Sequence, residues 1–428
     1  MSFEPKPYKR KLSPIERYYV SCDKRTQPYH TPCLNQMTIE GTGLIDELEW
    51  ARAVKKASLA NPGSRIVLKG SLGFACWVDS GKTTPFRVID GSDWDGQSDT
   101  GAPFLEDPLP AYEGPTSEVL LVKCKNSSYI IFRSHHGAMD GRGTQAFADD
   151  VFRVLKGEEP LGENSAMSDL DLSLQLTRVR SEMVTDEVRA PTGLPEGEEQ
   201  GRIWYRRTVT GKFSQVLAKI AIGIAHSARA YGDTNVRFQL PVDMRPRVEG
   251  LRSTANLSGG IMMNVPGDTS VNSWQSMIKN KLAEKREAVI PSFMRFIPIR
   301  LLCWISLKMM KNANNKLVEK RMVTGQYRAS GIISNLGLLP LDQYQGGGFK
   351  ATSAFFIPPD FDTTAFFLTV AGNKNGIELV LRLPKVLATR GRLNKALDSI
   401  VNSLDAKTTS PNKGSTTPQE TKPQLLPL

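Results

Sequence analysis

The stretch that decides the fold is Ser128-Tyr129-Ile130-Ile131-Phe132-Arg133-Ser134-His135-His136-Gly137-Ala138-Met139-Asp140-Gly141. Its first half is rich in β-branched and aromatic residues, a composition typical of a buried strand. The strand ends in two of the chain's four histidines, His135 and His136, and a turn containing Gly137 follows. Because successive side chains of a strand point to opposite faces, one histidine is expected to face a cleft while the other packs behind it.

The bulk composition indicates a globular protein of two lobes. The chain has 428 residues, which is too long for one small core. Of these residues, 40% are hydrophobic and 23% are charged, as in an ordinary globular protein. The N-terminus is polar and basic, and no run of about 18 uncharged apolar residues occurs, so we expect neither a secretory signal nor a membrane-spanning helix. Five scattered cysteines without a C-x-x-C pair indicate reduced thiols in a cytoplasmic protein. The net charge of +11 fits an anionic partner, although solubility alone would also account for it.

Hydrophobic periodicity predicts alternating strands and helices in both halves of the chain. A polar, Gly/Asp/Pro-rich stretch at 91–116 is expected to be a surface loop, and 157–201 is expected to connect the lobes. We therefore predict an N-terminal lobe carrying the histidine loop at 1–175, a C-terminal lobe at 176–404 and a disordered tail at 405–428.

Several kinds of site could contain the histidine pair. The simplest is a packed pair near a turn. A metal site is disfavoured because adjacent strand histidines diverge and no further His or Cys cluster is near in sequence. A Ser-His-Asp hydrolase is disfavoured because the chain has no Gly-x-Ser-x-Gly elbow. A lone general base suits the spacing, since an imidazole can take a proton from an attacking hydroxyl or amine near neutral pH.

The segment His135-His136-Gly137-Ala138-Met139-Asp140-Gly141 resembles the HHxxxDG signature of the chloramphenicol-acetyltransferase-like acyltransferases. That superfamily includes peptide-synthetase condensation domains, polyketide-associated acyltransferases, wax ester synthases and alcohol acyltransferases. Two further segments resemble its strand with a structural arginine and its Ser-Asn-x-Gly stretch: Pro241-Val242-Asp243-Met244-Arg245-Pro246 and Ser334-Asn335-Leu336-Gly337. The resemblance covers roughly residues 12–404. The Asp-Phe-Gly-Trp-Gly motif of the plant-type branch is missing, which argues against that branch.

The resemblance implies an α/β (α+β) fold of two lobes, each a mixed sheet with helices, and a substrate tunnel between them with the histidine loop at its middle. It also implies the roles of individual residues. His136 would be the general base, and Asp140 would pair with Arg245 to hold the shape of the loop. His135 would be a supporting residue, and Gly141 would permit a tight turn. Two residues would help the oxyanion or line the tunnel: Ser334 and Asn335.

The activity so implied is acyl transfer from a coenzyme A or carrier-protein thioester to a hydroxyl or amine, with ester formation favoured, in natural product or lipid biosynthesis. No covalent acyl-enzyme, bound cofactor or metal is needed. One alternative is an amide-forming condensation enzyme of the peptide-synthetase type. Another, from a different class, is a non-catalytic relative that only binds a carrier protein. The intact His136, Asp140 and Arg245 speak against this last alternative.

Residues 279–321 contain eleven Lys and Arg but only three Glu, so much of the excess charge lies there. Within them, 289–305 is strongly apolar. Three interpretations stay open: a core helix with a solvated basic face, a dock for an acidic carrier protein or the phosphates of coenzyme A, or a peripheral membrane contact through 289–311. The location is accordingly cytoplasmic, with or without membrane association. Nucleic acid is not expected as a partner, because no recognition motif is present.

Overall fold

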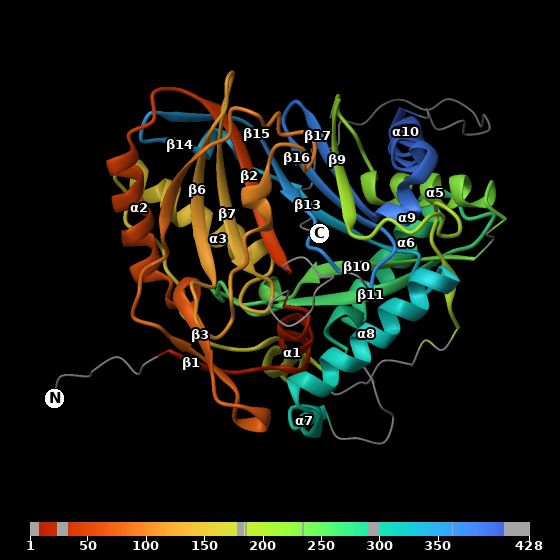
Figure 1. The fold of residues 1–428 in the computed structure, drawn as a ribbon, viewed down its shortest axis with the longest axis horizontal. Coiled ribbons are helices and arrows are strands. Elements are labelled where there is room, and N and C mark those ends of the chain that lie inside the picture. The colour runs from red at the N-terminus through yellow and green to blue at the C-terminus, as the bar shows by residue number, and fades with distance from the viewer. Residues whose placement is uncertain are drawn as a thin grey trace, which may run out of the picture.

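The computed structural model describes residues 8–23, 33–177, 184, 186–232, 235–289, 299–361 and 363–405. Two six-stranded sheets lie beside each other, each with helices packed on it (Figure 1). Both sheets mix parallel and antiparallel pairs, so the predicted α/β (α+β) fold of two mixed-sheet lobes is confirmed. The tail that was expected to be disordered lies almost entirely outside the described residues.

The first sheet has the strand order β14-β15-β2-β7-β6-β5. Helices α2 (Glu47–Ala60) and α3 (Gly141–Leu155) cover one face, because their apolar stripes place Trp50, Phe147 and Phe152 against Ile130 and Phe132 of the sheet. Its strands are β2 (Leu34–Thr42), β5 (Phe86–Asp90), β6 (Ser117–Lys123), β7 (Ser128–His135), β14 (Gln345–Gly346) and β15 (Phe349–Ile357). The strand that carries the histidines, β7, is central, with β2 and β6 on its two sides.

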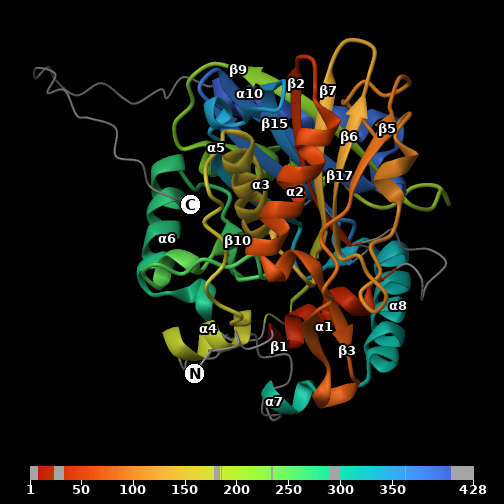
Figure 2. The ribbon, with the colours of Figure 1, turned by 90° about the vertical axis from the view of Figure 1, so that its left-hand side faces the viewer.

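The second sheet has the strand order β11-β10-β13-β16-β17-β9. Helices α5 (Val216–Arg229), α6 (Val271–Ala283) and α10 (Arg392–Asp405) pack on it and bury a large apolar cluster that includes Ile220, Trp274 and Leu397 (Figure 2). Its strands are β9 (Arg202–Thr210), β10 (Val236–Asp243), β11 (Ser258–Val265), β13 (Gly331–Leu338), β16 (Phe367–Asn373) and β17 (Gly376–Pro384).

One strand from the second half of the chain completes the first sheet. β15 pairs antiparallel with β2, from Lys350 opposite Thr42 to Ile357 opposite Gln36. The sequence order alone did not indicate this crossover, and the boundary at residue 175 stays a prediction.

A buried polar cluster also joins the two sheets. Arg206 of β9 donates to Glu378 of β17 and to Glu40 of β2, both at 2.8 Å. It further donates to Ser353 of β15 and lies 4.1 Å from the ring centre of Phe355. Charge-assisted bonds of this kind, shielded from water, fix the two sheets relative to each other.

Smaller elements close one end of the molecule. β1 (Lys9–Lys11), β3 (Ile66–Lys69) and β4 (Cys76–Asp79) form a three-stranded sheet. Helix α1 (Pro14–Ser21) follows β1 and begins with a capping box of Ser13 and Glu16. The remaining α-helices and strands are α4 (Asp169–Leu176), β8 (Val188–Arg189), α7 (Ile299–Leu302), the long α8 (Leu307–Thr324), β12 (Gln326–Tyr327) and α9 (Lys385–Ala388).

One expectation about connecting segments was wrong in part. The segment 91–116 is irregular, but Trp94, Phe104 and Leu105 are buried in a cluster that also contains Ile131 and Phe355, so it covers a face of the first sheet. The connection at 157–201 contains the short helix α4, whose Leu172 is fully buried. Among the residues that the structure describes, no helix is long and apolar enough to cross a membrane.

Candidate active site

The histidine loop leaves the end of β7 and is held by backbone hydrogen bonds. The His136 N–H donates to the Cys33 carbonyl at 2.9 Å, and the Ala138 N–H donates to the His135 carbonyl at 2.8 Å. The Asn35 amide donates to the Met139 carbonyl at 2.6 Å. These bonds fold the loop into a compact turn between a central strand and helix α3.

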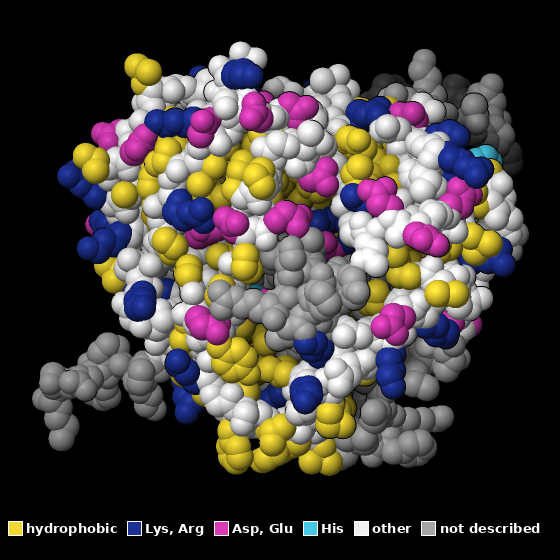
Figure 3. All heavy atoms as spheres, viewed as in Figure 1, with side chains coloured by type: hydrophobic (Ala, Val, Ile, Leu, Met, Phe, Trp, Pro, Cys, Tyr) yellow, Lys and Arg dark blue, Asp and Glu magenta, His cyan; other side chains and the backbone are white. Residues whose placement is uncertain are grey.

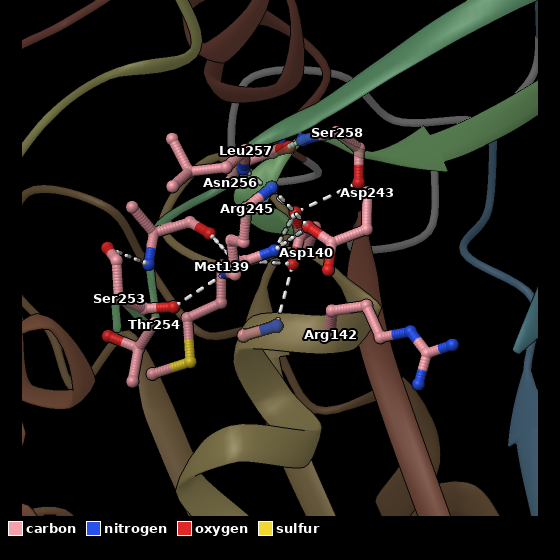
Figure 4. A network of polar contacts seen from close by, with 12 residues as sticks. Met139, Asp140, Arg142, Asp243, Arg245, Ser253, Thr254, Asn256, Leu257 and Ser258 are labelled. Carbon is pink, nitrogen blue, oxygen red and sulfur yellow. Dashed lines mark hydrogen bonds and ion pairs between the residues drawn. The ribbon is translucent and has the colours of Figure 1, made fainter. Parts of the chain in front are cut away.

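Asp140 anchors the far end of the loop. It is the N-cap of α3, where its carboxylate accepts the Gly143 N–H at 2.7 Å. Arg245 donates to both carboxylate oxygens, at 3.0 and 3.1 Å, so the pair is bidentate (Figure 4). The Leu257 N–H and the Ser258 hydroxyl donate to it at 2.8 and 2.9 Å. The expected pairing of Asp140 with Arg245 is therefore present.

Opposite charges face each other in this buried cluster. Burial by itself would raise the pKa of Asp140, but Arg245 and the hydrogen-bond donors hold that pKa below its usual value. Arg245 is held by further acceptors, the Ser253 carbonyl at 2.8 Å, the Ala255 carbonyl and the Asp243 carboxylate at 2.8 Å. A residue after β10 thus fixes a loop of the first sheet.

His136 lies against the second lobe in a different environment. The Asn256 amide nitrogen donates to the His136 carbonyl at 2.8 Å and lies 3.2 Å from Nδ1 of the ring. On the ring face, Tyr19 of α1 stacks at 4.3 Å between centres, and Phe361 lies at 5.4 Å. The residues that hold this imidazole come from three distant parts of the chain.

The imidazole of His136 is neutral at ordinary pH. Burial lowers the pKa of His136 to about 4, against opposing contributions from a hydrogen bond to its own backbone carbonyl and from the Asp140 charge. Residue 136 keeps 9% of its surface exposed. A neutral ring can accept a proton at Nε2 in the tautomer that carries its own proton on Nδ1, and the tautomer decides whether the Asn256 amide donates to the ring.

His135 is a packed residue on the opposite side of the strand end. Its Nδ1 accepts the Gly137 N–H at 3.0 Å, and its ring lies edge-on to Trp77 at 6.1 Å. Burial lowers the pKa of His135 as well. Because Nδ1 accepts a hydrogen bond, the proton of the neutral ring lies on Nε2, which is buried without a partner among the described residues.

A cavity of about 50 Å³ lies between the start of α3 and the second sheet, enough for a few waters. Both Ser334 and Asn335 line it, together with Gly141 and Arg142 from the start of α3. The structure therefore places three of the predicted site residues around one space: Gly141, Ser334 and Asn335.

One detail implied by the resemblance needs correction, and a second stays a prediction. Gly141 has no positive φ, so the turn does not require glycine there; a Cβ would instead lie 3.4 Å from Leu336, beside the cavity. The resemblance also implied a tunnel with the histidine at its middle. Among the residues that the structure describes, Tyr19 and Phe361 cover the His136 ring, and His136 does not line this cavity.

Sequence reasoning missed three residues that contact His136. These are Asn256, Tyr19 and Phe361. Asn256 is 120 positions from His136 in the chain, and nothing in the local pattern around any of the three marks it as a neighbour of the histidine.

Comparison with solved structures identifies the fold. No sequence profile of a protein family matches the chain, and no curated protein matches it by sequence. The starter condensation domain of rhizomide synthetase, in complex with C8-CoA and Leu-SNAC, aligns with a TM-score of 0.63 at 16% identity, covering 94% of this chain and 96% of that one. The first condensation domain of the calcium-dependent antibiotic synthetase gives 0.60 at 14%, covering 92% and 95%.

The condensation domain from Monacolin K polyketide synthase gives a TM-score of 0.59 at 11% identity, covering 92% of this chain and 96% of that domain. These alignments extend over nearly the full length of both partners and include both sheets. The chain therefore has the two-lobed fold of the condensation domains.

Proposed function

We propose that this protein is an acyltransferase that moves an acyl group from a coenzyme A or carrier-protein thioester to a hydroxyl or amine, with His136 as the general base. The observation that carries the proposal is the neutral imidazole of His136, held at the boundary of the lobes by Asn256. Two of the similar domains belong to peptide synthetases, and one is recorded with C8-CoA, which supports a thioester donor.

In the proposed reaction, His136 acts in the tautomer that carries its proton on Nδ1, so the Nε2 lone pair is free, and the Asn256 amide then donates to the His136 carbonyl and not to the ring. The acceptor O–H or N–H gives its proton to Nε2 as the oxygen or nitrogen attacks the thioester carbonyl. The tetrahedral oxyanion collapses, the C–S bond breaks, and the imidazolium returns the proton to the departing thiolate. No side chain of the protein is acylated.

Other residues have supporting roles in this proposal. Asp140 and Arg245 hold the loop and carry no proton in the reaction. Ser334 and Asn335 line the cavity beside the loop, where they help the oxyanion or guide a substrate. Tyr19 and Phe361 cover the imidazole, so an acceptor reaches it only when these rings shift. The donor and an acidic carrier protein are the proposed partners, and no bound cofactor is required.

Ester formation is the product class that we favour, and amide formation by a condensation-type reaction is the second candidate. The condensation-domain neighbours are the specific observation that favours the amide alternative. A non-catalytic carrier-binding relative is the third, and the intact set of His136, Asp140 and Arg245 argues against it.

The test is release of free thiol from acyl-CoA and acyl-pantetheine donors, with parallel panels of alcohols and amines, for wild type and His136→Ala. We expect a loss of at least about a hundredfold in kcat, the usual scale for removing a general base. Product mass spectrometry then separates ester from amide. Equal rates for the two proteins would reject the catalytic assignment.

A further inference from the structure

An apolar knob projects from one end of the molecule. It consists of two loop tips with large exposed side chains: Leu72 and Phe74 from the β3–β4 turn, and Leu301, Trp304 and Met309 around α7 and the start of α8. The Phe74 side chain is 74% exposed, Met309 65% and Trp304 50%. Figure 3 shows hydrophobic side chains gathered along the lower edge of the view, where Figure 1 places α7.

The two tips form one surface. The rings of Phe74 and Trp304 lie edge to face at 5.1 Å between centres. A Cβ atom at Gly73 would lie 2.5 Å from the Trp304 indole, so the turn and the indole are in close contact. Arg17 of α1, whose surface is 1% exposed, donates to the Leu72 carbonyl and, at 3.4 Å, to the Ile305 carbonyl. A buried guanidinium thus ties both tips to α1, and the knob has a defined shape.

The charges around the knob are of one sign. Neither 69–78 nor 299–311 contains an Asp or Glu. Lys69 and Lys11 are exposed, and the sheet register places them on the two sides of Cys76, next to the β3–β4 turn. Lys308 is exposed beside Met309. The surface that complements this arrangement is negatively charged and able to take up apolar side chains.

We propose that the knob docks on an anionic lipid bilayer, with Phe74 and Trp304 inserted at the headgroup boundary and the lysines on the lipid charges. Projecting Trp, Phe and Leu side chains with basic neighbours are the residues that bind bilayer interfaces. The docked face lies beside α1, because Asn314 of α8 donates to Ser21 of α1 at 2.8 Å. The same helix carries Tyr19, which covers His136. Helix α1 therefore contacts both the knob and the imidazole.

The test uses the full chain and flotation with vesicles of phosphatidylcholine alone or mixed with phosphatidylserine. Wild type is expected to bind the mixed vesicles and to bind the neutral ones more weakly. In the double variant Phe74→Ser with Trp304→Ser, binding should fall at least about tenfold, since the buried apolar area is lost. In the triple variant Lys11→Glu, Lys69→Glu and Lys308→Glu, the preference for anionic over neutral vesicles should fall by roughly fivefold per lysine. High salt should abolish that preference in wild type.

Fluorescence gives a readout at the residue itself. Trp304 is half-exposed, whereas the other five tryptophans are at most 3% exposed, so a blue shift of the emission on adding vesicles reports on Trp304. The matched control is Leu44→Ser, at a residue that is 95% exposed beside the β14–β15 turn; it should bind vesicles like wild type. Hydrolysis of a water-soluble thioester should be unchanged in all these variants.

Three results would overturn the proposal: no vesicle binding by wild type, equal binding by the Phe74/Trp304 double variant, or binding that ignores lipid charge. If wild type binds no vesicle and is a dimer that the double variant converts to a monomer, a second copy of the chain covers the knob. If only an acidic carrier protein binds there, the surface is a protein dock. Because binding is measured without turnover, failure here leaves the acyl-transfer proposal intact.

Discussion

The two ends of the histidine loop are built in opposite ways, although they are four residues apart. At one end, the Asp140 carboxylate accepts five hydrogen bonds and keeps its charge. At the other, the His136 ring packs against two aromatic rings with one amide beside it, and burial removes its charge. The contrast teaches that a polar clamp, here the Asp140–Arg245 network, can hold a loop in place while the same loop presents a neutral imidazole with few hydrogen bonds.

The largest expected effect separates the two histidines. His136→Ala should lower kcat by at least about a hundredfold, because the proposed proton acceptor is gone. The matched change His135→Ala should instead lower the free energy of unfolding, since that ring packs against Trp77 and accepts the Gly137 N–H. Thiol-release assays and urea unfolding on both variants check this division. A larger kcat loss in the His135 variant would reverse our assignment of the two residues.

The next largest effect is expected from removing the negative charge of Asp140 from the clamp. Asp140→Asn should lower the free energy of unfolding by about 3 kcal/mol, because Arg245 keeps its charge in a buried site without its main partner. The matched control is Asp243→Asn, which removes the other carboxylate of the same arginine at a half-exposed position. Urea denaturation should show a loss of under about 1 kcal/mol there. Equal losses would mean that the clamp does not depend on Asp140.

Asn256 should act as a positioning residue. Asn256→Ala should lower kcat roughly tenfold with little change in KM, since the amide holds the carbonyl and the Nδ1 side of His136 rather than the substrate. Asn256→Asp should move the acid limb of the pH–rate profile upward, because a carboxylate beside the ring raises the pKa of His136. An unchanged profile would show that the side chain has only a structural role.

The pH dependence of activity and stability tests the environment of the His136 ring. The pKa of His136 is lowered to about 4 in the folded state, below the usual 6.5, so kcat/KM should fall only as the pH approaches 4. Between pH 6.5 and about pH 4 the unfolded state binds more protons at this ring than the folded state does. The free energy of unfolding should therefore fall as the pH falls through this range. Comparing wild type with His136→Gln by urea unfolding at several pH values isolates the contribution of this ring. A fall in kcat/KM that begins near pH 6.5 would contradict the lowered pKa of His136.

The sequence predicted those parts of the site that are local in the chain. The run from Ser128 to Gly141 predicted strand, turn and helix, and the resemblance indicated the distant Arg245. The contacts of His136 with Asn256, Tyr19 and Phe361 could not be predicted, because they form only when the two sheets and the N-terminal helix pack together. Trp94 and Phe104 show the reverse error: polar neighbours in the segment suggested a surface loop, but the apolar side chains are buried against the sheet.

The pairing of β15 with β2 has a consequence for how the chain matures. On a ribosome, residues 34–42 emerge long before 349–357, so one edge of the first sheet waits unpaired while most of the protein is synthesised. During that interval the open edge is a template for foreign strands. If the two lobes were expressed as separate chains, they would therefore have to associate by pairing β15 with β2. The N-terminal half alone should aggregate, because the edge of its sheet at β2 stays unpaired.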